Sequence, residues 1–334
     1  GMGFVEIEDL SARATVRCYR LVYQGAKEIV DLEGSTRQPL QVRSPQLEMT
    51  AGRMLFDRRN GEGQVPGDGR LRLGDRDKPA APRAPASPPG VLPREVEITW
   101  QERLDIELED ESKGSSIRSA RFQGDVKVDH ADFALGSRSL LAQFGPGRAG
   151  RDDAVLKRIV ADGNAKASRL GDQGSLAATL IDLELDEDSQ GRPIPTVMKA
   201  RGRVEARDST QTMWSPDLMV FFEPKGADSA ATPRGVRGGL ALEGDMGDVK
   251  VTRVLAGRLE ELGPPLDASA GGDAGPIERG VQVLLRDGAR VFAKRLDGNA
   301  RDRRVTLDGP DVMIVQRNVV ADGLQHLDID ETKG

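Results

Sequence analysis

One short unit recurs along the chain and constrains the fold more than any other feature. In each copy a glycine precedes an alternating segment, and a second strand-like segment follows. The first copy covers Phe122 to Phe144, with Gly124 as its glycine. The later glycines are Gly163, Gly202, Gly247 and Gly298, at spacings of 39, 39, 45 and 51 residues. A period in this range indicates one supersecondary unit that is stacked repeatedly.

The segment after the glycine has the alternation of a half-buried strand. In Val126-Lys127-Val128 the valines lie on one face and the lysine on the other. Glycine tolerates a positive φ, so it suits a tight turn, a bulge or a bend before the strand. Asp162-Gly163-Asn164 and Asp297-Gly298-Asn299 are strong signals for hairpins or corners. A unit this thin buries its apolar face only by stacking on its neighbours.

The remaining sequence extends the β pattern and divides the chain. Residues 1–74 form a first β-rich block of the same repeat type, and the proline-rich stretch 75–94 predicts a linker or a long surface loop. Residues 95–334 carry the clearest repeats, interrupted by low-complexity insertions at 223–239 and 262–277. A short helix near 153–159 is the one departure that the pattern allows. The sequence therefore predicts an all-β fold of stacked antiparallel strand pairs with Pro- and Gly-rich loop insertions.

Charge and cysteine content exclude several classes of protein. The chain has 48 Lys and Arg against 54 Asp and Glu, so it lacks the basic footprint of a nucleic-acid binder. A single cysteine, Cys18, permits neither an intrachain disulfide nor a CxxC motif, and we interpret it as an apolar strand position. No signal peptide is visible, and both ends look like cuts within a longer protein. The longest apolar run, near 218–222, is too short for a membrane-spanning helix.

Motifs for catalysis and metal binding are missing from the sequence. His130 and His326 are the only histidines, and neither belongs to an HExxH pattern or accompanies a GxSxG elbow. We interpret His130 as a surface residue in a loop. The many acidic residues offer carboxylate pairs, but no pattern selects one pair as a glycosidase would require. We therefore predict no enzyme activity, no metal site and no cofactor.

At the repeated segments the chain resembles the LptA/OstA-like family of lipopolysaccharide-transport proteins. The resemblance is carried by 161–167 followed by 176–181, by 200–206, and by Ala321-Asp322-Gly323, and it covers roughly 95–334. It implies a twisted β-jelly roll of stacked V-shaped strand pairs, whose apolar interior carries acyl chains of lipopolysaccharide across the periplasm. The Pro-rich insertions and the length depart from a simple single-domain bridge and favour a multi-repeat envelope protein.

The apolar positions of the alternating strands are the candidate lipid-binding residues. They are Val126, Val128, Leu140, Phe144, Ile181, Leu183, Leu185, Val204, Leu218, Val220, Phe222, Val249, Val251, Val312 and Ile314. Alternation predicts that these side chains share the inner face of the sheets. It fits a lipid groove and a filled sandwich core equally well, so both interpretations stay open.

Three functions are compatible with this pattern. The first is an envelope lipid-binding or bridging protein that takes part in lipopolysaccharide transport, with lipopolysaccharide or another acylated lipid, other transport proteins or copies of itself as partners. The second is a structural β-solenoid scaffold that polymerises end to end through open strand edges. The third is a carbohydrate-active β-helix enzyme. The first is the leading hypothesis and places the protein in the periplasm or cell envelope.

Overall fold

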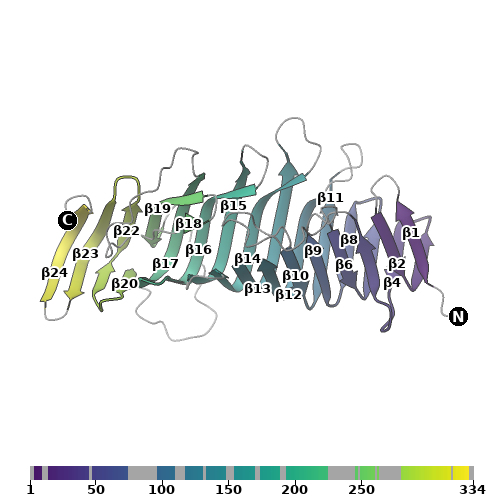
Figure 1. Ribbon diagram of the computed structural model, residues 1–334, viewed down its shortest axis with the longest axis horizontal. Coiled ribbons are helices and arrows are strands. Elements are labelled where there is room, and N and C mark those ends of the chain that lie inside the picture. Colours follow the sequence, from purple (N-terminus) through teal and green to yellow (C-terminus); the bar gives the residue numbers. More distant parts are fainter. Residues whose placement is uncertain are drawn as a thin grey trace, which may run out of the picture. The chain divides into compact units, whose positions relative to one another are not determined.

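The protein is almost entirely β structure. The computed structural model describes residues 4–9, 14–44, 47–73, 96–109, 117–130, 133–147, 154–169, 174–188, 193–224, 245–246, 249–259, 262, 280–316 and 319–330. These residues form 24 strands that pair antiparallel, which confirms the predicted all-β antiparallel architecture (Figure 1). No helix capable of crossing a bilayer occurs in the described part of the chain.

The chain divides into two compact units, 1–163 and 164–334, with the boundary inside β14 (Ala154–Arg169). Strand β14 replaces the short helix predicted near 153–159, so that prediction was wrong. Its β-branched residues Val155, Ile159 and Val160 favour the strand.

Two antiparallel layers build the first unit. Layer A contains β1 (Val5–Asp9), β2 (Ala14–Cys18), β5 (Leu40–Arg43), β6 (Leu47–Ala51), β9 (Gly69–Leu73) and β10 (Val96–Trp100), paired in this order. Layer B contains β3 (Arg20–Gln24), β4 (Ile29–Glu33), β7 (Arg53–Asp57), β8 (Glu62–Pro66) and β11 (Arg103–Leu108). Strand β12 (Ile117–His130) belongs to both, because its first half pairs with β11 and its second half with β10. Strand β13 (Phe133–Pro146) pairs with both halves of β12.

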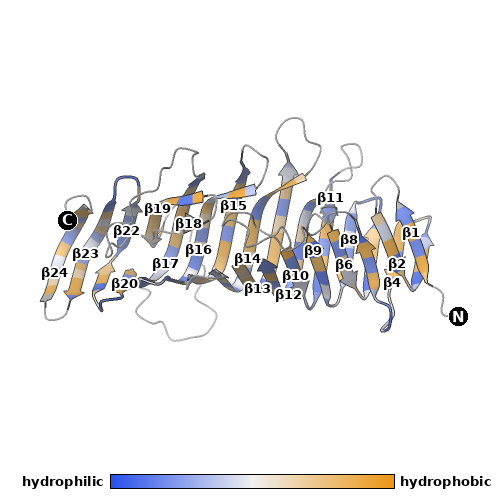
Figure 2. Ribbon diagram, in the orientation of Figure 1, coloured by the Kyte–Doolittle hydropathy of each residue, from blue (hydrophilic) through white to orange (hydrophobic). Residues whose placement is uncertain are grey.

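Strict alternation explains why the layers pack face to face. In β8, Gly63 and Val65 are buried while the residues between them are exposed. Figure 2 shows hydrophobic and hydrophilic bands alternating along these strands. On the outer face of layer A, cross-strand ion pairs join Arg43 to Glu48 at 3.0 Å and Arg72 to Glu97 at 2.7 Å. Surface pairs of this kind add little stability, so burial of the inner faces provides the main driving force.

The strands pass between layers at corners that contain the repeated glycines. Gly124 and Asp125 both have a positive φ, 81° and 44°, and together they face the single residue Arg138 of β13. A Cβ at Gly124 would lie 2.7 Å from the backbone nitrogen of Glu102, so only glycine fits there. Two residues opposite one is the count of a β-bulge, which bends a strand sharply. The predicted role of Gly124 is thus confirmed.

The second unit repeats this construction. Its strands are β15 (Ser175–Glu187), β16 (Pro193–Arg207), β17 (Gln211–Pro224), β18 (Asp245–Met246), β19 (Val249–Gly257), β20 (Val281–Leu285), β21 (Arg290–Ala293), β22 (Arg295–Asn299), β23 (Arg304–Gln316) and β24 (Val319–Asp330). The second half of β17 continues through β19 and β22 to β23, forming layer C. The first half continues through β20 and β21 to β23, forming layer D. Strands β23 and β24 run through both layers.

The later glycines differ in how they are used. Gly202 and Arg203 have φ values of 74° and 52° and face the single residue Pro216, so they form the same corner as Gly124 and Asp125. Gly163 also has a positive φ, 79°. Gly298, in contrast, lies in regular register between Val254 and Val305, and the turn begins after Asn299. The spacing therefore identifies a repeating unit but not the role of every glycine in it.

The predicted linker, the main part of both low-complexity insertions and Gly247 lie outside the described residues. The strands on either side of the linker nevertheless pair directly, β9 with β10 and β8 with β11. The first block therefore shares both of its layers with the segment that begins at Val96.

Candidate functional site

The predicted lipid-binding residues lie mainly in the interior of each unit. Buried members are Val126, Val128, Leu140, Ile181, Val204, Leu218, Val220, Phe222, Val249 and Val312. Half-buried members are Phe144, Leu183, Leu185, Val251 and Ile314. The structure places several of them in cross-strand contact, such as Phe222 opposite Val251 in the second unit. Phe144 differs from the rest, since it lines a hollow on the outer face of layer B.

Trp100 dominates the interior of the first unit, although sequence reasoning did not select it. Its side chain is 2% exposed, and its ring centroid lies 5.4 Å from that of Phe122 at an interplanar angle of 58°. The indole fills the space above Gly69 on the neighbouring strand. Its Nε1–H has no hydrogen-bond acceptor among the described residues. The alternation of Val96, Ile98 and Trp100 was a signal that the indole points inward, but nothing in the sequence connects it to Gly69.

A row of inner-face residues leads from Trp100 toward the outermost strands of the unit. Successive cross-strand partners are Trp100, Gly69, Ala51 and Leu40, on β10, β9, β6 and β5. Adjacent strands are about 4.8 Å apart, so the row spans about 14 Å. Its far end joins a cluster of Cys18, Leu32 and Leu40, against which half-buried residues of both layers pack.

Apolar side chains are exposed where the first unit has its outermost strands. On β1, Val5 and Ile7 are each 37% exposed, and on β3, Tyr23 is 52% exposed. Val5 lies opposite Cys18 and Ile7 opposite Val16, which places both on the inner side of layer A. Among the described residues β1 pairs only with β2, and β3 only with β4. The inner face is thus accessible along this edge.

Cys18 lies directly behind this edge. It is 3% exposed, as the interpretation of an apolar strand position requires, and burial raises the pKa of its thiol. A neutral, buried thiol behaves as a small apolar side chain.

A buried polar network stabilises one corner of the second unit. The hydroxyl of Ser215 donates to the carbonyl of Asp217 at 2.6 Å and accepts from the backbone N–H of Gly257 at 2.7 Å. The Asp217 carboxylate accepts from the N–H of Leu259 at 3.3 Å, and its other oxygen lies 3.5 Å from Nε of Arg201. These contacts fasten the segment after β19 to the corner of β17, so we assign the network a structural role.

The fastened segment covers a second apolar cluster on the outer face of layer C. Met219, Leu255 and Leu259 are buried there, with Val197, Phe221 and Leu262 packed around them. Because β17 is apolar on both faces between 218 and 222, its outer side chains require this cover. The sequence showed the continuous apolar run but not the segment that packs on it.

The two histidines lie in different surroundings. His130 ends strand β12 and stacks on Phe133 with ring centroids 5.0 Å apart, so it does not lie in a loop as predicted. His326 lies between two carboxylates, with Nδ1 at 2.6 Å from Asp308 and Nε2 at 3.4 Å from Asp328. Hydrogen bonds to both carboxylates raise the pKa of His326, and the bond to Asp308 makes the largest contribution. No group of three or more metal-ligating side chains occurs within the described ranges.

Comparison with known proteins gives no family assignment. No family model matches the chain, and neither a curated protein nor a solved structure is significantly similar to it.

Proposed function

We propose that the protein binds an acylated lipid between the two layers of its first unit and acts as a lipid-carrying or bridging protein of the cell envelope. The observation that carries this proposal is the Nε1–H of Trp100, a donor without an acceptor among the described residues of an apolar interior. Lipopolysaccharide, the ligand that the resemblance implies, and other acylated lipids share the group that this donor needs, an ester or amide carbonyl.

Physical chemistry favours a ligand at this donor. Leaving a buried donor unsatisfied costs about 1–3 kcal/mol, so native proteins rarely do so. A buried water needs two to four polar partners, and neither the neighbouring Phe122 ring nor Gly69, which has no side chain, offers a polar side-chain atom. A carbonyl attached to an acyl chain supplies the acceptor, while the chain itself contacts apolar side chains.

The exposed edge provides the route for the acyl chain. Val5, Ile7 and Tyr23 present apolar surface to solvent, and Cys18, Leu32 and Leu40 follow behind them. A chain that enters between β1 and β3 would displace half-buried side chains first and reach the row that ends at Trp100. Binding at this edge removes exposed apolar area from water, which is favourable by about 25 cal/mol per Å².

The bridging part of the proposal depends on strand edges. Strand β1 in the first unit and β24 in the second each pair with only one neighbour among the described residues. Their free edges present backbone donors and acceptors that can add a strand from another envelope protein or from a second copy. The periplasm is the proposed location, and we propose no enzymatic activity.

Native lipid and a brominated probe test the proposal directly. Mass spectrometry of solvent extracts from the purified protein should detect acylated lipid. The chain has two tryptophans, so Trp214→Phe leaves Trp100 as the only indole. In that variant a brominated fatty acid methyl ester should quench the fluorescence. In the otherwise unchanged chain, Trp100→Phe should remove the preference for the ester over an alkane of equal length, measured by displacement of a fluorescent acyl probe. No quenching would contradict lipid binding at Trp100, whereas equal affinity for ester and alkane would contradict the hydrogen bond alone.

A structural scaffold is the second candidate, and one observation favours it. Val65, Leu104 and Phe122 are at most 1% exposed, so this part of the interior is filled by the protein's own side chains. Concentration-dependent assembly of protein that carries no extractable lipid would support the scaffold over the carrier.

A further inference from the structure

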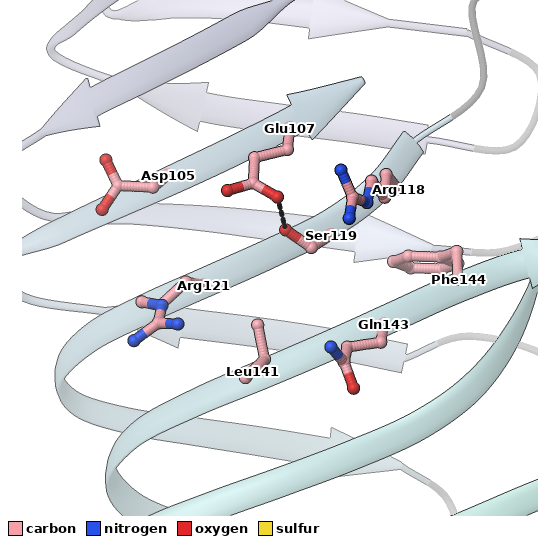
Figure 3. Close-up of a pocket in the computed structure, with 8 residues that line it drawn as sticks. All are labelled: Asp105, Glu107, Arg118, Ser119, Arg121, Leu141, Gln143 and Phe144. Carbon is pink, nitrogen blue, oxygen red and sulfur yellow. Dashed lines mark hydrogen bonds between the residues drawn. The ribbon is translucent and has the colours of Figure 1, made fainter. Parts of the chain in front are cut away.

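A hollow of about 210 Å³ lies on the outer face of layer B, away from the interior between the layers. Eight residues from β11, β12 and β13 line it: Asp105, Glu107, Arg118, Ser119, Arg121, Leu141, Gln143 and Phe144 (Figure 3). Two cross-strand rows supply six of these side chains. One row is Asp105, Arg121 and Leu141, and the other is Glu107, Ser119 and Gln143.

An irregularity in the sheet turns Arg118 toward the hollow. Alternation from the buried Ala120 and Phe122 would place residue 118 on the inner face. The register with β11 shifts between Glu107 and Leu108, so that Ser119 faces Glu107 while Ile117 faces Leu108. Arg118 is the extra residue of this bulge and becomes exposed. Bulges redirect side chains in this way and are common beside binding sites.

The carboxylates and the arginines around the hollow differ in their hydrogen bonding. Asp105 accepts from Nε of Arg103 at 2.5 Å, and Glu107 accepts from the hydroxyl of Ser119 at 3.0 Å. The guanidinium groups of Arg118 and Arg121 have no hydrogen bond or ion pair within the described residues. The hollow therefore has two cationic groups whose hydrogen-bonding capacity is free, whereas both of its carboxylates already have donors.

The remaining lining suits a ring next to the charge. Leu141 and Phe144 provide apolar surface, and the Gln143 amide lies in the same row as Ser119. A volume of about 210 Å³ is below the roughly 300–1,000 Å³ of pockets for drug-sized ligands, so a nucleotide or a peptide is too large. One ring with one acidic group fits this size.

We propose that the hollow binds a small organic anion, a carboxylate or phosphate monoester attached to a single ring. The anion pairs with the guanidinium groups of Arg118 and Arg121. A guanidinium can donate two parallel hydrogen bonds to a carboxylate or to a phosphate, so both kinds of anion suit the site. The ring rests on Leu141 and Phe144. This site is independent of the lipid proposed between the layers, because it lies on the opposite face of layer B.

Calorimetric titration of the purified full chain tests the site with four probes. Benzoate and phenyl phosphate should bind, and the stronger of the two identifies the preferred oxyanion. Inorganic phosphate lacks the ring and should bind more weakly, and benzylamine, a cation of similar shape, should not bind. Arg121→Ala and Arg118→Ala should each weaken binding about tenfold, the loss expected for one charged hydrogen bond.

Matched variants separate the site from general effects of charge. Arg20→Ala removes an exposed arginine from another part of the first unit, where it pairs with Glu33, and should leave the affinity unchanged. Phe144→Ala should lower the affinity for phenyl phosphate to that for inorganic phosphate. The proposal is overturned if none of the anions binds at millimolar concentration, if benzylamine binds in their place, or if Arg20→Ala weakens binding as much as Arg121→Ala does.

Discussion

The indole of Trp100 occupies the space that a side chain at Gly69 would need, because a Cβ there would lie 2.7 Å from both Cε2 and Cη2. We expect Gly69→Ala to lower the free energy of unfolding by about 1–3 kcal/mol, since overpacking forces a buried ring off its rotamer. Denaturant unfolding measures the change. Gly136→Ala is the control, because a Cβ at that strand position meets nothing within 4 Å. Equal effects of the two substitutions would show that Trp100 can relax away from residue 69.

Ser215, at a corner of the second unit, should contribute more to stability than Ser137, its counterpart in the first unit. Ser137 makes the same hydroxyl-to-carbonyl bond two residues along, to Ser139 at 2.9 Å, but Ser215 also accepts from the N–H of Gly257. Ser215→Ala should cost about 1–3 kcal/mol, because it leaves a buried donor without an acceptor, and Ser137→Ala about 1 kcal/mol. Chemical denaturation of both variants tests the difference. A larger loss for Ser137→Ala would contradict this account.

A substitution at Val220 distinguishes a packed core from a lipid groove in the second unit. It is 5% exposed and lies between Met198 and Val254 on adjacent strands. We expect Val220→Ala to lower stability by roughly 1–3 kcal/mol and to leave displacement of a fluorescent acyl probe unchanged. Val251→Ala, at a half-buried position, should cost less. Weakened probe binding with an unchanged melting temperature would instead place a lipid groove in this unit.

The last strand should be pH-sensitive through His326. Its hydrogen bonds to Asp308 and Asp328 raise its pKa in the folded protein above the unfolded value of about 6.5. The protonated imidazole therefore adds stability that is fully present below about pH 6.5 and is lost as the pH rises through the folded pKa. Melting temperatures of the wild type and His326→Gln should converge across this window. Asp308→Asn should reduce the difference, and a gap that widens with rising pH would contradict the sign.

Sequence periodicity predicted the positions that depend on local geometry. Val126 and Val128 point inward because the strand repeat is two residues, and Gly124 forms a corner because glycine tolerates the positive φ that the bend requires. Features that depend on partners distant in sequence were not predictable. The packing of Trp100 on Gly69 and the cover of Met219 by Leu259 each join segments about 30 residues or more apart.

The hollow on layer B shows why alternation alone can mislead. Residues 118 and 144 have the inward parity of their strands, yet both line the outer surface. A single bulge opposite Leu108 changes the direction of Arg118, and no residue type in that segment predicts the bulge.

The corners also determine where the chain tolerates a change of length. Phe122 and Val126 point inward, with Gln123 and the two-residue corner Gly124-Asp125 between them. On the partner strand Leu140 and Ser137 point inward, with Ser139 and the single corner residue Arg138 between them. Corners of one and of two residues therefore both preserve the inside-outside order of the strand. A residue inserted at a corner leaves Val128 facing the core, whereas one inserted between Val126 and Val128 would turn the rest of the strand inside out. Natural length variation and engineered insertions should accordingly concentrate at these corners.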